Sequence, residues 1–347
     1  MFFWNTSSPQ GLVSCRNWKS SLLAVVAALG VALACPADLS VSAAGKDPPK
    51  KKKTFPAPNH VKLSTKDGVV LACTYFPATK EENKEANIVP VILIHGWNGV
   101  GGEFNRLALY LQSLGHAVIV PDLRGHGESV RRRDHDRDTV RIDLKRMRPE
   151  EIAGMYLYDV EAVKTHLLEE HNQGKLNIEL LTIVGTELGA IVAANWAVLD
   201  WSWPILPSLK QGQDVKALVL VSPKQALKGL KMQPAYRHEN VRRLPTLVLV
   251  GTDDRRAYSD AKRMHSKLKR FHAASSRNSR NARGEDVPRT LFLAEFPTSL
   301  QGTKLLDARV SDNKLSPHEW IGRFINFRVV SQKDVYGWKE RGSPTGG

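Results

Sequence analysis

Apolar residues along the chain fall into two alternating patterns. The first is a short continuous apolar run, which is typical of strands buried on both faces of a parallel sheet. The second is helical spacing between these runs, as in 104–115, where Leu107, Leu111 and Leu114 share one face. This alternation predicts an α/β fold with a doubly wound, mostly parallel sheet. The apolar runs, each with the turn that follows it, lie at 89–97, 116–129, 178–185, 215–223, 244–254 and 288–296.

The folded body begins with a different strand pattern. Residues 60–78 alternate apolar and polar positions around the turn Lys66-Asp67-Gly68, which predicts an antiparallel hairpin. The expected sheet therefore has eight strands. Only about twenty residues separate the last residue of 215–223 from 244–254, so no large cap domain is expected there. Further helices are expected at 149–170, 188–199, 257–269 and 316–329.

The first residues carry the pattern of a secretory signal peptide. Arg16 and Lys19 precede the apolar run "SLLAVVAALGVALA", and small residues follow. We expect 1–43 to be a signal, cleaved near 34 or 43, and the protein to be exported to the periplasm or cell envelope, or secreted. The run is shorter than the roughly 20 apolar residues of a membrane span, so no spanning segment is expected after cleavage. Cleavage before Cys35 would instead give a lipoprotein.

Composition divides the rest of the chain into three parts. Residues 44–59 are rich in Lys and Pro, which is typical of a flexible linker. Residues 60–335 suit one large α/β domain, and 336–347 are expected to be a flexible tail. Cys73 is the only cysteine of this domain in the sequence, so no disulfide can form within it.

The formal net charge of +15 is concentrated in a few segments, including 131–148 and 262–283. Such runs are often solvated loop surface. They could also attract an anionic partner, and for an exported protein we expect a lipid head group or an acidic polysaccharide. Aromatic residues are nearly absent from both runs, which favours the interpretation as solvated loops, and nucleic acid is the least expected partner of an exported protein. A second insertion in the fold, at 272–287, is also basic.

Four short motifs follow one another along the chain: "IHGW" at 94–97, "PDLRGHGES" at 121–129, "GTELG" at 185–189 and "GTDD" at 251–254. In this order and spacing they resemble the α/β-hydrolase family over residues 61–327. The resemblance implies a nucleophile at a strand-turn-helix elbow, an acid and a histidine after later strands, and two oxyanion-stabilising backbone amides.

Carried onto this sequence, the resemblance gives the elbow an unusual residue. Gly185 and Gly189 are the elbow glycines, and Glu187 stands at the nucleophile position. The oxyanion donors would be the backbone amides of Trp97 and Leu188. We expect that Glu187 could accept hydrogen bonds from these amides and occupy the oxyanion hole itself.

The other two triad positions differ in how well they match. Asp254 stands where the acid belongs, with Asp253 as its neighbour, although an aspartate there can also cap the next helix. The histidine position, after Gly302, is Thr303. Threonine has no basic nitrogen, so two of the three triad positions depart from the family pattern.

No other residue supplies the missing groups. His95 and His126 belong to the family's structural loops, and His318 falls on the final helix. Ser129 and Ser222 lie at strand ends outside any G-x-S-x-G elbow. No HExxH, paired CxxC or P-loop pattern is present, so no metal and no cofactor are expected.

These observations favour a protein without serine-hydrolase activity, with a binding or envelope-associated role and an unidentified small molecule or anionic envelope component as partner. One alternative is an active hydrolase of esters or carbon-halogen bonds, with Glu187 as nucleophile or base and Asp254 or a histidine assisting. This alternative requires a histidine ring near Glu187. A second alternative is adhesion to anionic lipid or polysaccharide through the basic surface.

Overall fold

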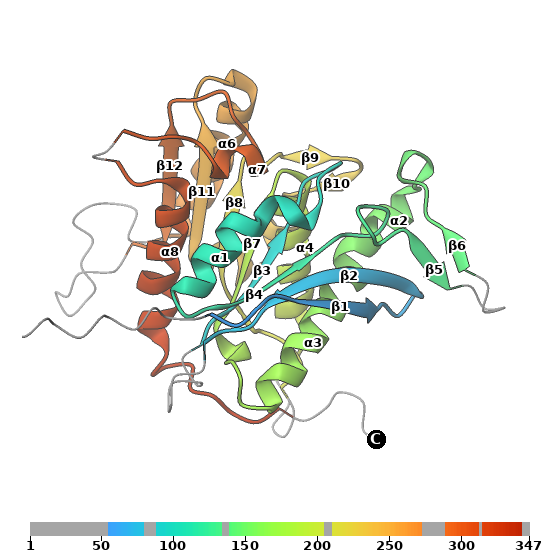
Figure 1. Ribbon diagram of the computed structural model, residues 1–347. Coiled ribbons are helices and arrows are strands. Elements are labelled where there is room, and N and C mark those ends of the chain that lie inside the picture. The colour runs from blue at the N-terminus through green and yellow to red at the C-terminus, as the bar shows by residue number, and fades with distance from the viewer. Residues whose placement is uncertain are drawn as a thin grey trace, which may run out of the picture. The chain divides into compact units, whose positions relative to one another are not determined.

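A mostly parallel sheet runs through the domain (Figure 1). The structure is a computed structural model, and the chain divides into two units, 1–52 and 53–347. The predicted signal 1–43 and most of the predicted linker 44–59 lie outside the described residues, as does most of the insertion 272–287. The structure describes residues 55–79, 88–133, 139–204, 210–272, 289–311 and 314–341.

The parallel strands are those expected from the continuous apolar runs. Five of the parallel strands, β3, β4, β7, β8 and β11, are buried along their whole length, because helices cover both faces of the sheet. The predicted hairpin is β1 (Asn59–Ser64) and β2 (Val69–Phe76), paired antiparallel. The parallel strands are β3 (Pro90–Ile94), β4 (Ala117–Pro121), β7 (Leu181–Thr186), β8 (Val215–Val221), β11 (Thr246–Gly251) and β12 (Leu291–Phe296).

Helices pack on both faces of the sheet (Figure 1). One face carries α1 (Asn105–Ser113), α7 (Thr303–Leu306) and α8 (Pro317–Arg328). The other carries α2 (Pro149–Gly154), α3 (Val160–Asn172), α4 (Leu188–Ser202), α5 (Gln233–Arg237) and α6 (Arg255–Lys269). Short 3-10 turns lie at Gly101–Phe104, Leu144–Arg146, Ile178–Leu180, Val241–Arg243 and Val330–Gln332. Within the described ranges, no helix combines the length and the apolar character needed to cross a membrane.

The sheet is wider than the eight strands expected from the sequence. Within the described residues it has ten, in the order β12-β11-β8-β7-β3-β4-β2-β5-β6, with β1 paired to β2. The two additional strands, β5 (Arg131–Arg133) and β6 (Thr139–Arg141), come from the basic insertion, and β5 pairs with β2. Both are too short and too polar to show a strand pattern. Between β8 and β11 there is a small hairpin, β9 (Ala226–Leu227) and β10 (Leu230–Lys231), rather than a large cap.

The buried side chain of Arg124 connects the β1–β2 turn to the helical segment that contains Asp159. The Arg124 guanidinium donates to Asp159 at 2.7 and 2.9 Å and to Asp67, in the β1–β2 turn, at 2.6 Å. Burial opposes the charge, but the two carboxylates raise the pKa of Arg124. A Cβ at Gly154 would lie 2.1 Å from its Nη1 atom. The predicted helix 149–170 is interrupted directly after Gly154 by a π-helical turn, Met155–Asp159.

The segment expected to be a flexible tail begins with residues held on the domain. The Trp338 indole donates to the carbonyl of His171 at 3.1 Å. The Arg341 guanidinium is buried, donates to both Asp214 carboxylate oxygens at 2.9 Å, and forms an ion pair with Glu179. The described domain therefore extends past residue 335, to Arg341.

Candidate functional site

The turn between β7 and α4 has the geometry of a nucleophile elbow. A Cβ on Gly185 would lie 2.3 Å from the carbonyl oxygen of Gly189, and one on Gly189 would lie 2.3 Å from that of Ile94. Only glycine fits at both positions. Glu187, at the tip, has φ 48° and ψ −104°, a conformation that a side chain with a Cβ rarely adopts. The elbow therefore presents Glu187 at the carboxyl end of β7.

The Glu187 carboxylate lies between two loops and beside one cation. Ideal Cβ positions on Gly96 and Gly302 would be 3.0 and 3.3 Å from its Oε2 atom. The Nζ atom of Lys224 is 3.9 Å from its Oε1 atom. About a third of the side chain, 32%, is exposed. Glu187 is therefore an accessible carboxylate with a lysine as its charged neighbour.

The backbone amides expected as oxyanion donors are those of Trp97 and Leu188. Trp97 follows β3, and Leu188 begins α4, so its amide is one of the free N–H groups of a helix start. In the part of the chain that the structure describes, neither amide donates a hydrogen bond to the Glu187 carboxylate. The carboxylate lies instead toward Lys224, so it does not occupy the oxyanion hole.

Two buried histidines hold the loop that carries Trp97. His95 donates from Nδ1 to the carbonyl of Gly96 at 2.8 Å and accepts at Nε2 from the amide of Leu123 at 3.0 Å. Burial lowers the pKa of His95 to about 4, so the ring is neutral at pH 7. His126 accepts from the amide of Asn98 at 3.3 Å. Both rings are engaged in loop structure, as the sequence suggested.

Hydrogen bonds of the Ser222 and Gln301 side chains hold the loop after β12 next to the elbow. The Ser222 hydroxyl donates to the Gln301 Oε1 atom at 2.7 Å and accepts from the amide of Gly302 at 2.9 Å. The Gln301 side-chain amide donates to the carbonyl of Gly251 at 3.0 Å. Gly302 thus lies against Glu187, and the next residue, Thr303, donates its hydroxyl to Glu103. The histidine position is therefore beside the elbow, but it holds no base.

The expected acid is used elsewhere. Asp254 accepts at 3.0 Å from the amides of Arg256 and Ala257, which caps α6. Its neighbour Asp253 accepts from Thr252 at 3.1 Å. Within the described residues neither carboxylate contacts Glu187 or Thr303. The structure thus places Gly302, the residue before Thr303, against Glu187 and leaves Asp254 in its capping role.

Comparison with known proteins agrees with this architecture. A family model described as alpha/beta hydrolase fold matches residues 89–299. The chain belongs to the α/β-hydrolase fold family. No curated protein matches the sequence.

Solved structures of α/β-hydrolase enzymes share the fold at low identity. An esterase from Pyrococcus furiosus is 16% identical, with 79% of this chain and 92% of that chain covered and a TM-score of 0.50. A carboxyl esterase from Bacillus coagulans is 11% identical, with 79% and 99% covered and a TM-score of 0.52. A 2,6-dihydroxy-pseudo-oxynicotine hydrolase is 13% identical, with 83% and 72% covered and a TM-score of 0.51. At these identities the likeness establishes the fold alone.

As a member of the α/β-hydrolase fold family, this chain has a glycine-flanked elbow with Glu187 at its tip. Throughout the described residues, no histidine forms a hydrogen bond or an ion pair with Glu187. His318 stacks on Tyr110 on the outer helices, with ring centroids 5.8 Å apart. Ser129 donates to the carbonyl of Asp122 at 2.7 Å and fixes its loop. In the same residues, no group of three or more His, Cys, Asp and Glu side chains could hold a metal ion.

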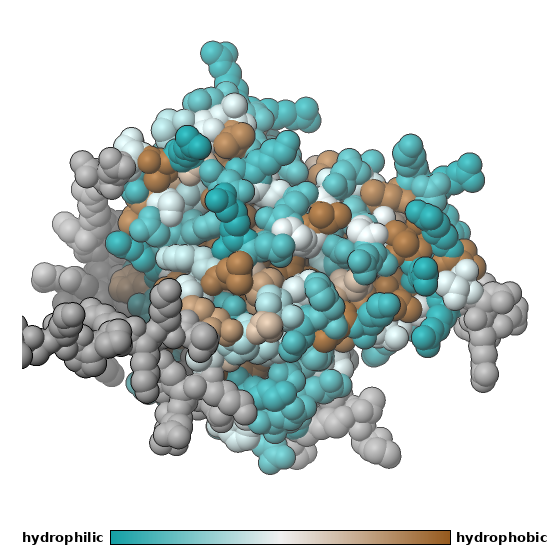
Figure 2. All heavy atoms as spheres, in the orientation of Figure 1, coloured by the Kyte–Doolittle hydropathy of each residue, from teal (hydrophilic) through white to brown (hydrophobic). Residues whose placement is uncertain are grey.

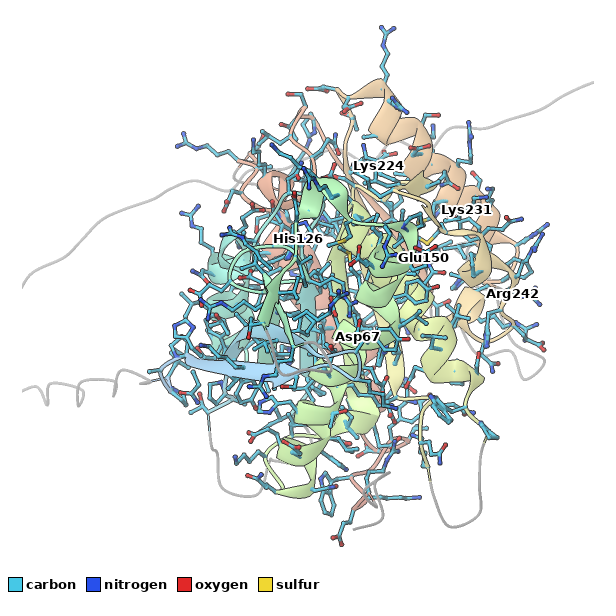
Figure 3. The ribbon with its side chains drawn as sticks, turned by 90° about the vertical axis from the view of Figure 1, so that its right-hand side faces the viewer. Asp67, His126, Glu150, Lys224, Lys231 and Arg242 are labelled. Atoms are coloured by element: carbon cyan, nitrogen blue, oxygen red, sulfur yellow. The ribbon has the colours of Figure 1, made fainter. Side chains whose placement is uncertain are left out.

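Sequence reasoning missed two lysines of the site. Lys224 and Lys228 lie in the short segment after β8 and in the β9–β10 turn, and Lys228 Nζ is 4.6 Å from the centre of the Trp97 ring. Figure 3 views the domain from the side of β5 and β6 and labels Lys224. The repeated lysines of "PKQALKGLKM" were the available signal. The role of these lysines depends on where the β9–β10 hairpin lies in the fold. The sequence composition does not determine that position.

Proposed function

We propose that this α/β-hydrolase-fold protein is a ligand-binding protein without serine-hydrolase activity, exported and associated with the cell envelope. One observation carries the proposal: the elbow presents the Glu187 carboxylate next to Lys224, and among the described residues no histidine forms a hydrogen bond or an ion pair with it. The family scaffold is retained around this pair, while the groups that would perform acyl transfer are absent from their positions.

Charge supports the same conclusion. A carboxylate at the elbow has a negative charge where an acyl enzyme must stabilise a developing oxyanion, so it would oppose rather than assist that transition state. The Lys224 ammonium next to it is a counter-ion for Glu187. Such a pair favours recognition of a polar or charged ligand over attack on an ester.

The alternative of an active hydrolase using Glu187 needs a base for turnover. An ester formed on Glu187 would have to be hydrolysed by an activated water. Asp254 caps α6 and Thr303 bonds to Glu103, so neither is directed at Glu187. The geometry therefore favours binding over this chemistry.

The test of catalysis uses the full-length protein purified after export. Turnover of p-nitrophenyl acetate and butyrate and release of halide from short haloalkanes are measured for the native chain, Glu187→Gln and the control Glu169→Gln, an exposed helix residue. We expect no turnover above the uncatalysed rate in any of the three. Turnover that is lost in Glu187→Gln and retained in Glu169→Gln would establish an enzyme and overturn the proposal.

Export is tested separately, by the mass of the protein recovered from the envelope and extracellular fractions. A mature chain beginning near residue 35 or 44 supports the proposal. An intact chain recovered only from the cytoplasm contradicts it.

A further inference from the structure

Two open grooves border the ribbon formed by β5 and β6. The first has a volume of about 770 Å³ and includes Trp97, Arg141, Lys145 and Lys228 in its lining. The second, of about 530 Å³, includes Lys62, Arg131 and Arg133. Val130 contributes to the lining of both grooves. We call the two together the ribbon groove.

The cations of the ribbon groove differ from their neighbours in lacking acidic partners. Arg132 pairs with Glu151 at 3.3 Å, and Arg146 pairs with Asp143 at 3.7 Å. In the part of the chain that the structure describes, by contrast, none of the groove cations forms an ion pair with an acid. These groove cations are Lys62, Arg131, Arg133, Arg141, Lys145 and Lys228.

The strand register adds repulsion inside the ribbon. Arg131 and Arg141 are directly opposite each other in the antiparallel pairing of β5 and β6. Residues opposite each other in such a pair extend from the same face, and like charges there destabilise the ribbon. An anion bound between them would relieve this repulsion. The two acids that line the groove, Glu128 and Asp143, do not balance its cations, and Asp143 already caps the Leu144–Arg146 turn.

The groove contains a half-buried aromatic ring as well as charge. Trp97 lines the first groove, with Lys228 over its ring at 4.6 Å. In Figure 2, hydrophilic side chains surround several apolar residues at the right, where Figure 1 places β5 and β6. Aromatic faces beside cations suit a sugar ring that carries negative groups.

We propose that the ribbon groove binds an anionic polysaccharide chain, whose carboxylate or sulfate groups are held by the groove cations and whose sugar ring contacts Trp97. A flexible chain can enter the two concave grooves, whereas a flat bilayer would contact only the side chains that protrude most from the surface. An anionic polysaccharide would be the ligand class of the proposed binding function. Binding in the groove does not depend on that function. Only the approach of the bound chain to the elbow, through Trp97, rests on it.

The experiment measures binding by calorimetry at two salt concentrations. The probes are polygalacturonate, dextran sulfate, neutral dextran, a single-stranded oligonucleotide and phosphatidylglycerol vesicles. The groove variant is Arg141→Gln/Lys145→Gln/Lys228→Gln. The control, Arg256→Gln/Arg263→Gln/Lys269→Gln, removes the same charge from exposed positions of α6. Thermal melts check that both variants fold.

We expect the native chain to bind one of the anionic polysaccharides and not neutral dextran. The groove variant should bind it at least about tenfold more weakly, and the control less than about twofold. Equal weakening in both variants would show attraction by net charge alone and overturn the inference. Groove-dependent preference for the oligonucleotide or the vesicles would overturn the ligand class. Ester turnover, measured separately, would overturn the proposed function and leave a positive binding result standing.

Discussion

The Nζ atom of Lys224 lies 3.9 Å from the Oε1 atom of Glu187, with 24% and 32% of the two side chains exposed. Lys224 comes from the segment after β8, and Glu187 from the elbow after β7. The pair nearly cancels the charge at the position where an α/β-hydrolase has its nucleophile. Because both groups are partly solvated, their attraction adds little to stability. If the proposed binding role holds, the pair acts mainly on the charge that a ligand meets at the elbow.

Replacing Lys224 by Met should therefore weaken ligand binding while leaving the free energy of unfolding nearly unchanged. We expect a change in unfolding free energy of less than about 0.5 kcal/mol, because the pair is partly exposed. Polygalacturonate binding should weaken by about fivefold, because Glu187 is left as an uncompensated negative charge. Urea unfolding and calorimetry measure the two effects. Lys231→Met on β10 is the matched control, and an equal loss of binding in it would contradict the role of Lys224.

The backbone at Glu187 makes glycine the preferred residue. With φ 48° and ψ −104°, any residue with a Cβ is strained by about 1–3 kcal/mol. Glu187→Gly should therefore be more stable than Glu187→Ala by about 1 kcal/mol or more, the reverse of the usual order in ordered structure. Thermal or urea unfolding of the two variants measures the difference. If Ala were the more stable of the two, the elbow would not have this conformation in solution.

The elbow shows how much of the site the sequence could predict. Gly185 is required by a close contact within the turn, to Gly189, and Gly189 by one to Ile94 on the neighbouring strand β3; the "GTELG" pattern marks both positions. The long parallel strands were equally accessible, because burial on both faces leaves a continuous apolar run. Gly302, the residue before the expected histidine position, lies against Glu187, while Thr303 itself donates to Glu103.

Contacts between distant segments could not be predicted in the same way. The Ser222–Gln301 hydrogen bond joins residues 79 apart in the chain, and neither residue type marks such a partner. The strands β5 and β6 are three residues each and show no apolar alternation, and β5 is held by pairing with β2 and β6 by pairing with β5. Asp254 fits both an acid and a cap by sequence, and only its hydrogen bonds assign it to the cap.

Restoring the missing groups tests whether the scaffold still supports the chemistry. Glu187→Ser alone should not react with a fluorophosphonate probe, because no histidine side chain in the described residues forms a hydrogen bond or an ion pair with the residue at position 187. Adding Thr303→His places an imidazole beside Gly302, next to the elbow, and should give detectable labelling by activating the serine. Mass spectrometry of the labelled peptide measures the yield. Labelling of the single variant at the same rate would reveal a base elsewhere, and Ser222→Ala in the double variant controls for reaction at that hydroxyl.

The contacts of Arg341 predict that the last described residue matters for stability. Its guanidinium is buried against Asp214 and Glu179. Arg341→Met would leave these carboxylates with fewer partners, and loss of one member of a buried ion pair costs about 3–5 kcal/mol. We expect the lower end of this range, because Lys164 and Lys210 also contact Asp214. Urea unfolding measures the change. The exposed neighbour Lys339→Met should change stability by less than about 0.5 kcal/mol, and an equal effect in both would exclude a specific role for Arg341.

Acid sensitivity should arise from histidines that are buried in their neutral form. Burial lowers the pKa of both His95 and His116 from 6.5 to about 4. Between these values the unfolded chain binds more protons than the folded chain, so stability falls as the pH is lowered from about 6.5 to about 4. Each histidine contributes up to about 3 kcal/mol to this loss. Urea unfolding at pH 7.5, 5.5 and 4.5 measures the slope. His116→Leu should reduce the loss on acidification, while His60→Leu, exposed on β1, should not. A slope unchanged by His116→Leu would show that this ring is not the neutral, buried group the structure describes.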